Sequence, residues 1–140
     1  MKNPKELKAR YPYQFAGPQI SMSFSRGWFN LFAQLCADID QVLGDDKRGF
    51  HWRQVKEKFG QARVCYQLAE GAVDRDPDVA EKIMSMKVQA EVASSKVCAL
   101  CGRPGMMDLK PGWMLALCEE HRAQADAGTL PSIWFEGDEL

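Results

Sequence analysis

The residues best suited to chemistry are three cysteines and one histidine near the C-terminus. Cys98 and Cys101 form a C-A-L-C pair, and sixteen residues further on Cys118 and His121 form a C-E-E-H pair. Three thiolates and one imidazole supply the closed tetrahedral shell that Zn²⁺ takes in structural sites. A closed shell leaves no position for water or substrate, so the spacing predicts one structural Zn²⁺ rather than a catalytic metal.

The residues around these pairs predict a treble-clef-like zinc module over residues 97–128. Gly102 permits a tight turn after the first pair, because glycine adopts backbone angles that other residues avoid. Pro104-Gly105 and Pro111-Gly112 are turn signals, and the apolar run 113–117 is typical of a strand. The second ligand pair then opens a predicted helix that ends near residue 127.

Two other interpretations of the four residues stay open. One is a cluster of buried thiols beside a solvent-exposed His121. The other is a redox pair made of Cys98 and Cys101, which the missing βαβ context disfavours. The remaining cysteines, Cys36 and Cys65, lie on otherwise apolar segments, and this pattern is typical of a reducing cytosol rather than of a disulfide framework.

Composition limits the classes of protein that the chain can belong to. Its 140 residues, 46% of them hydrophobic, suit one domain with a small metal-stapled annex. A formal net charge of −1 gives no global field that attracts nucleic acid or membrane. The basic start is followed by no apolar stretch, and no apolar run is long enough to span a bilayer, so we expect a cytoplasmic protein.

The pattern of apolar residues predicts an α+β fold with two main helices and a small β element ahead of the zinc module. Residues 23–43 carry an apolar stripe at helical spacing, and residues 76–96 form the second helix, with Asp76 as its N-cap. Residues 63–68 are typical of a strand. The segment before them is ambiguous between a short helix stopped by Gly60 and a hairpin that turns at Phe59-Gly60.

This pattern divides the chain into four parts: an arm (1–22), a body (23–96), the zinc module (97–128) and a tail (129–140). We expect the arm to be extended around Pro12, with its aromatic side chains packed on the body. The triplet Ile133-Trp134-Phe135 predicts a tail that docks on the body. The alternative is a tail that binds a partner.

A basic and aromatic segment over residues 47–63 is the candidate binding surface. Its cations would neutralise phosphates, while its histidine and tryptophan would stack on bases. This interpretation requires the cations to line one face, and the alternative is an ordinary solvated surface. The candidate binding residues are Lys47, Arg48, His51, Trp52, Arg53, Lys56, Lys58 and Arg63.

Three segments together resemble a family of small, mostly uncharacterised proteins of bacteriophages and prophages. They are G-W-F-N-L-F-A-Q-L-C (27–36), Q-V-K-E-K-F-G-Q-A-R-V-C-Y (54–66) and C-A-L-C-G-R-P-G…G-W-M-L-A-L-C-E-E-H (98–121). In order and spacing the likeness covers roughly residues 11–123. It implies a phage accessory protein with a zinc site at Cys98, Cys101, Cys118 and His121, and it implies no particular activity.

These observations favour a non-enzymatic binding protein. Treble clefs also occur in HNH-type nucleases, but the chain has two histidines and one is assigned to zinc, so no catalytic set is visible. No phosphate-binding glycine loop or other small-molecule site is evident. We therefore expect a protein partner, such as a host defence or nucleic-acid-processing complex that the protein modulates or inhibits. Nucleic-acid binding through residues 47–63 is the alternative, and an HNH-like nuclease is a remote one.

Overall fold

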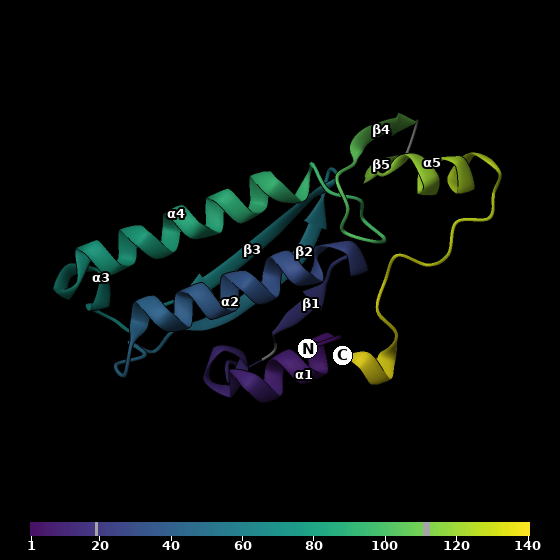
Figure 1. Cartoon of the computed structure of the whole chain (residues 1–140). Helices are drawn as coiled ribbons and strands as arrows, with labels where there is room; N and C mark the ends of the chain where they lie inside the picture. Colours follow the sequence, from purple (N-terminus) through teal and green to yellow (C-terminus); the bar gives the residue numbers. More distant parts are fainter. Residues whose placement is uncertain (19, 111–112) are drawn as a thin grey trace.

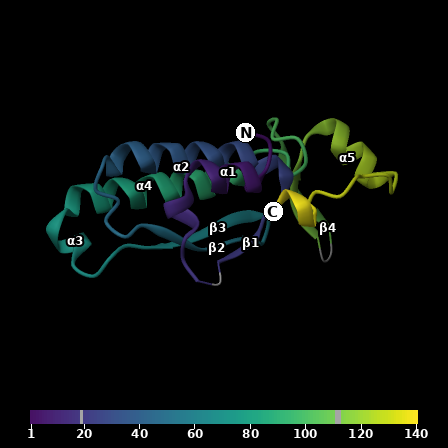
Figure 2. The ribbon, with the colours of Figure 1, turned by 90° about the horizontal axis from the view of Figure 1, so that it is seen from below.

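The structure is a computed structural model that describes residues 1–18, 20–110 and 113–140, and its fold is α+β, as predicted. Helices α2 (Phe29–Leu43) and α4 (Pro77–Ser94) lie across a three-stranded sheet (Figure 1). Figure 2 shows the helices on one side of the sheet, with no described helix on the other. The other elements are α1 (Pro4–Arg10), β1 (Ser21–Ser23), β2 (His51–Lys58), β3 (Gln61–Gln67), α3 (Ala72–Arg75), β4 (Met106–Lys110), β5 (Trp113–Leu117), α5 (Glu119–Asp126) and 3₁₀ turns at Pro12–Phe15, Arg26–Trp28 and Gly137–Glu139.

Strands β2 and β3 form an antiparallel hairpin, and β1 pairs with β2 in parallel. The hairpin turns at Phe59 and Gly60, whose φ angles are +55° and +79°. Two consecutive positive φ values are typical of a type I′ turn, the two-residue turn whose twist matches that of the strands. The hairpin alternative for this segment is therefore confirmed, and the short helix ending at Gly60 is wrong.

The main core lies between the helices and the sheet. Trp28, Phe32 and Ile39 enter it from the start and body of α2, while Trp52 and Val55 enter it from β2, and all are at most 5% exposed. Trp52 and Val55 are three residues apart, yet both face the core, because a bulge interrupts the pairing between Trp52 and Gln54. Trp28, which belongs to the predicted apolar stripe of residues 23–43, is thus a core residue.

Helix α4 covers the outer edge of β3. The side-chain oxygens of Ser94 and Glu91 accept hydrogen bonds from the backbone N–H groups of Ala62 and Val64, at 2.8 and 2.9 Å. These N–H groups would otherwise be open to pairing with another chain. Only Ile83 and Ser94 of α4 are buried, because one side of this helix meets the edge of a strand instead of a deep core.

The arm differs from the extended segment that we predicted. Residues 4–10 form α1, with Asn3 as N-cap accepting a hydrogen bond from the N–H of Glu6, and residues 12–15 form a 3₁₀ turn. Leu7 of α1 is fully buried. The predicted packing of the arm's aromatics is confirmed, because Tyr11, Tyr13 and Phe15 pack against the core.

The tail docks on the start of the body. Ile133 is buried, and its carbonyl oxygen accepts a 2.6 Å hydrogen bond from the N–H of Arg26. Trp134 forms a bridge with Ser25, while its side chain stays 40% exposed. The predicted turn at Pro111-Gly112 lies outside the described residues. Among the described residues, no helix has the length and apolarity needed to cross a bilayer.

Candidate metal centre

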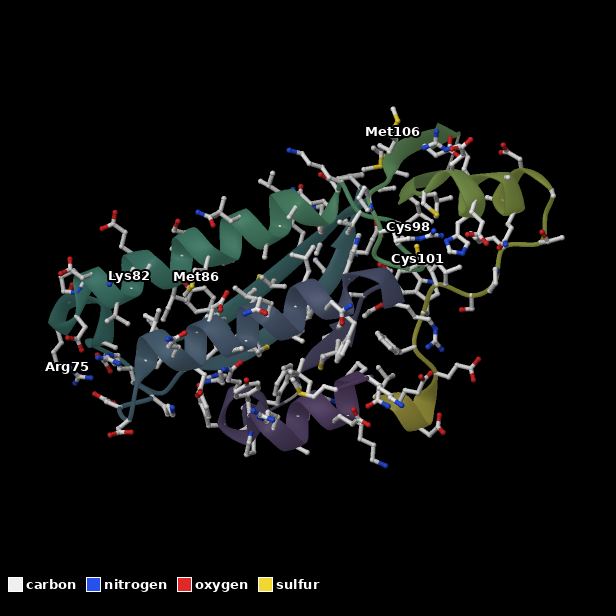
Figure 3. All side chains as sticks on the ribbon, in the orientation of Figure 1. Arg75, Lys82, Met86, Cys98, Cys101 and Met106 are labelled. Carbon is white, nitrogen blue, oxygen red and sulfur yellow. The ribbon has the colours of Figure 1, made fainter. Side chains whose placement is uncertain are left out.

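The four predicted ligands converge at the junction of the body and the C-terminal module. Cys98 and Cys101 lie in the turn that follows α4, Cys118 precedes α5, and His121 lies in the first turn of that helix. Figure 3 shows Cys98 and Cys101 where this turn approaches α5. The ligand atoms of all four residues lie within 4.8 Å of one another, so the cluster is compatible with a metal site.

The distances fit a tetrahedral ion. With Zn–S bonds of about 2.3 Å and Zn–N bonds of about 2.0 Å, a tetrahedron has S···S edges of about 3.8 Å and S···N edges of about 3.5 Å. Here the Sγ atoms of Cys101 and Cys118 are 3.9 Å apart. The Nδ1 atom of His121 lies 3.3 Å from the Sγ atoms of both Cys98 and Cys118. Since a disulfide has an S–S bond of about 2.05 Å, the geometry is that of converging ligands and not of a disulfide.

Arg103 supplies positive charge to this cluster. Its Nε atom donates to Cys101 Sγ at 3.3 Å, and its guanidinium also reaches Cys118 Sγ at 3.6 Å and Glu120 at 2.7 Å. Burial opposes ionisation of Cys101, but hydrogen bonds from Arg103, together with those from Cys98 and Cys118, outweigh it and lower the pKa of this thiol to about 6. Burial raises the pKa of Cys98. One sulfur of the cluster is therefore already disposed to be a thiolate, the form that binds metal.

The backbone holds the first ligand pair in a fixed turn. The N–H of Gly102 donates to the carbonyl of Cys98 at 2.9 Å, and Gly102 has a φ of +77°, which explains its place after the second cysteine. Ala99 donates to the carbonyl of Ala116 in β5 at 2.8 Å. The turn is thereby attached to the strand that leads into Cys118.

A comparison of the chain with protein-family models, with curated proteins and with solved structures found no match. The resemblance to phage proteins stays a prediction from the sequence. The functional interpretation of this protein therefore depends on its own residues and their geometry.

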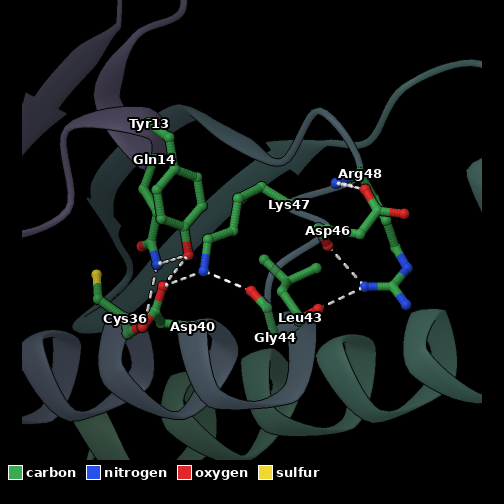
Figure 4. Close-up of polar contacts among 9 residues, drawn as sticks. All are labelled: Tyr13, Gln14, Cys36, Asp40, Leu43, Gly44, Asp46, Lys47 and Arg48. Atoms are coloured by element: carbon green, nitrogen blue, oxygen red, sulfur yellow. Dashed lines mark hydrogen bonds and ion pairs between the residues drawn. The ribbon is translucent and has the colours of Figure 1, made fainter.

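The predicted basic segment separates into groups with different roles. Lys47 donates to Asp40 at 2.9 Å and to the carbonyl of Gly44 at 2.6 Å (Figure 4). Arg48 donates to the carbonyl of Leu43 and forms an ion pair with Asp76 at 2.8 Å. These two cations hold the loop after α2 in place, so they do not belong to a binding face.

Trp52 corrects our prediction of a binding residue. Its side chain is fully buried, and its Nε1 donates to Gln14 Oε1 at 3.1 Å. It cannot stack on a base or contact a partner in this structure. The ring of His51 lies against the arm, since a Cβ at Gly17 would be 2.6 Å from the Cδ2 of that ring, and its Nδ1 is 2.9 Å from the carbonyl oxygen of Gly49.

The remaining four cations are brought together on one surface. Arg53, Lys56, Lys58 and Arg63 lie on the side of β2 and β3 that faces away from the helices. Binding to nucleic acid through this segment requires its cations to line one face, and four of the predicted residues meet this condition.

Sequence reasoning missed a groove between the tail and the C-terminal module. It has a volume of about 540 Å³, and its apolar wall comes from β5, the end of α5 and the tail. Glu57 of β2 lies at its margin. No motif predicts this groove, because it forms only when the tail docks. Its lining includes Met114, Leu115, Leu130, Ile133 and Trp134.

Proposed function

We propose that Cys98, Cys101, Cys118 and His121 hold one structural Zn²⁺ in a treble-clef-like module. The support is the ligand set together with its near-tetrahedral spacing. All four coordination positions are supplied by protein, so the ion stabilises the module and does not activate water. Metal analysis of the purified protein tests this proposal: one equivalent of zinc supports it, and protein that stays folded without metal contradicts it.

The zinc-stabilised scaffold serves as a non-enzymatic binding protein of phage accessory type, and its partner is a protein. The observation that carries this proposal is the groove beside Trp134. Apolar and aromatic side chains set in a concave surface are the usual anchors of protein interfaces. The resemblance to phage proteins favours a target in the host cytoplasm, such as a defence or nucleic-acid-processing complex.

Phe59 adds support from the same end of the molecule. The turn that carries it packs against the β4–β5 hairpin, since a Cβ at Gly60 would be 2.7 Å from the sulfur of Met107. The side chain of Phe59 is 67% exposed, and its φ of +55° is one that bulky residues avoid. Asparagine or glycine would suit this turn better, so an exposed phenylalanine here is explained by contact with a partner.

Affinity capture from host lysate with matched variants tests the docking surface. We expect Phe59→Asn and Trp134→Ala to lose a captured protein while they retain metal content and helical circular dichroism. Phe59→Asn should fold at least as well as the parent, because asparagine tolerates the turn, so its loss of binding cannot come from unfolding.

Val88→Ala is the discriminating variant. Met84, Val88 and Val92 form a second exposed apolar stripe on α4, each 46–48% exposed. Loss of the partner in Val88→Ala alone would place the interface on α4 and contradict the groove. Retention of the same partner by all three variants would overturn the docking proposal.

A further inference from the structure

The face of the three-stranded sheet that points away from the helices is polar throughout. The paired residues Val55 and Val64 face the core, so their strand neighbours face outward. The pairing of Ser21 with Gln54 and of Ser23 with Lys56 extends this face onto β1. The outward residues are Ser21, Ser23, His51, Arg53, Gln54, Lys56, Lys58, Gln61, Arg63, Cys65 and Gln67.

This face carries cations and no carboxylate. Four of its residues are Lys or Arg, and the one acidic residue of β2 and β3, Glu57, pairs with Ala62 on the helix side. Its oxygen accepts a 2.7 Å hydrogen bond from the N–H of Gly60. The formal net charge of −1 therefore conceals a strongly positive local surface.

Three of these cations have no ionic partner within the part of the chain that the structure describes. The ion pairs there involve other cations, namely Arg26, Lys47, Arg48, Arg75, Lys87 and Arg103. This set does not include Lys56, Lys58 or Arg63. Moreover, Lys56 lies directly opposite Arg63 in the ladder. Like charges at directly opposed positions destabilise a hairpin, so this arrangement is unfavourable unless an anion binds between them.

We propose that this outer sheet face binds the phosphate backbone of a nucleic acid. Arg53, Lys56 and Lys58 follow one another along β2, and Arg63 lies beside them, so the charges form a row suited to a linear polyanion. The proposal goes beyond the protein-binding groove, because it concerns the opposite side of the sheet and different residues.

The composition of the face argues against other anionic partners. A membrane surface is bound by apolar and aromatic side chains that enter the lipid, and the only aromatic ring among the outward residues is that of His51, which lies against the arm. An acidic protein would be anchored by apolar contacts, which are equally missing. Because the His51 ring packs against the arm, no aromatic side chain of the face is free to stack on bases. The contacts therefore go to phosphates, and binding depends on salt rather than on base sequence.

Fluorescence anisotropy with the zinc-loaded full chain tests the proposal. The probes are labelled single-stranded DNA, duplex DNA and RNA, each measured across a salt series. We expect binding at low salt that weakens steeply as salt rises. In a Lys56→Gln/Arg63→Gln variant, the slope of log affinity against log salt should fall by about 2, or about 1 for each phosphate that is no longer neutralised.

The matched control removes two exposed cations elsewhere, Lys5→Gln/Lys82→Gln. Lys5 belongs to α1. Lys82 belongs to α4 and is labelled in Figure 3, so the net charge changes equally while the sheet face is intact. An unchanged slope in this control supports the proposal. The proposal is overturned if the parent does not bind at low salt. It is also overturned if the slope falls equally in both double variants.

Two further probes exclude other occupants. Binding of phosphatidylserine vesicles or of poly-glutamate in place of nucleic acid, with loss in Lys56→Gln/Arg63→Gln, would overturn the assignment to nucleic acid. Trp134→Ala separates this face from the groove: it should bind nucleic acid as the parent does, and a loss of this binding would contradict the independence of the two surfaces.

Discussion

The carbonyl oxygen of Cys98 packs against Gly27 so closely that a Cβ added to Gly27 would lie 1.9 Å from it. The N–H of Gly27 also donates to the carbonyl of Ala99 at 2.8 Å. The turn that carries the first candidate metal ligand thus packs on the backbone that leads into α2. The body and the C-terminal module are joined here as well as through the end of α4.

Replacing Gly27 should therefore destabilise both parts together. In Gly27→Ala the methyl group meets backbone atoms, which cannot rotate away, so we expect a loss of about 1–3 kcal/mol or more in the free energy of unfolding. We also expect weaker metal retention. Urea unfolding and a chelator competition measure the two effects. Gly137→Ala is the control, because a Cβ there has no atom within 4 Å; equal stability of the two variants would contradict the close packing.

Loss of a ligand should unfold the C-terminal module and leave α2 formed. In Cys118→Ser the ion loses one of four ligands, and metal-binding free energy in such modules is folding free energy. Hydrogen exchange should show weaker protection over the described residues of 97–128, while the core around Trp28 stays protected. Cys65→Ser, which changes an exposed thiol outside the cluster, should retain its metal. Full metal content and an unchanged melting temperature in Cys118→Ser would refute the ligand assignment.

Arg103 should strengthen metal binding without being a ligand. Its guanidinium contacts two of the sulfurs, and groups that hydrogen-bond to ligands typically contribute about 10–100-fold to metal affinity. We expect Arg103→Gln to lower zinc affinity by that factor in a chelator competition, with the fold retained. Arg75→Gln removes an exposed arginine distant from the cluster (Figure 3) and should leave the affinity unchanged. Equal affinities in the two variants would mean that Arg103 is only a surface residue.

The parts of the site that sequence predicts best are those defined by local spacing. The four candidate ligands and the bodies of the two main helices follow from residue type and period, so they needed no tertiary information. The start of the first helix was wrong, since α2 begins at Phe29 and a 3₁₀ turn at Arg26–Trp28 replaces its predicted first turns. Arg103 carries only a weak local signal, two residues after Cys101. Gly27 carries none, because its role appears only when the turn after α4 lies upon it.

The outer sheet face shows why the basic segment was ambiguous. Trp52 and Val55 are three residues apart, and Val55 and Phe59 are four apart, which is helical spacing and not the alternation of a strand. The bulge at Arg53 resolves this, since it turns Trp52 and Val55 to the same side. Helix α1 was missed for a related reason: seven residues are too few for a periodic signal, and its stability comes from the burial of Leu7.

Acid should weaken the contact between the arm and α2 through Asp40. The hydroxyl of Tyr13 donates to this carboxylate at 2.6 Å, and this bond, helped by Lys47 against partial burial, lowers the pKa of Asp40 below 3.8 (Figure 4). A lowered pKa means that the stabilisation is complete above the unfolded value and is lost as pH falls through the folded one.

We therefore expect the parent to be more stable than Asp40→Asn at neutral pH, with a gap that narrows as the pH falls below about 4. Urea midpoints measured from neutral pH down to acid follow this gap. The control is Asp38→Asn on the same helix. It removes a carboxylate that accepts a hydrogen bond from Gln34 and not from a tyrosine. A gap that stays constant with pH would show that Asp40 acts through packing and not through its charge.

Gln14 should be needed for a unique core, because it is fully buried and joins three parts of the fold. Its Nε2 donates to the carbonyl of Cys36 at 2.9 Å, and its Oε1 accepts from Trp52. In Gln14→Leu the indole N–H is left buried without a partner, and we expect a loss of about 1–3 kcal/mol. In Gln14→Leu/Trp52→Phe the orphaned donor is gone, so the double variant should lose less than the sum of the single ones in urea unfolding. Strict additivity of the two changes would show that this hydrogen bond contributes nothing.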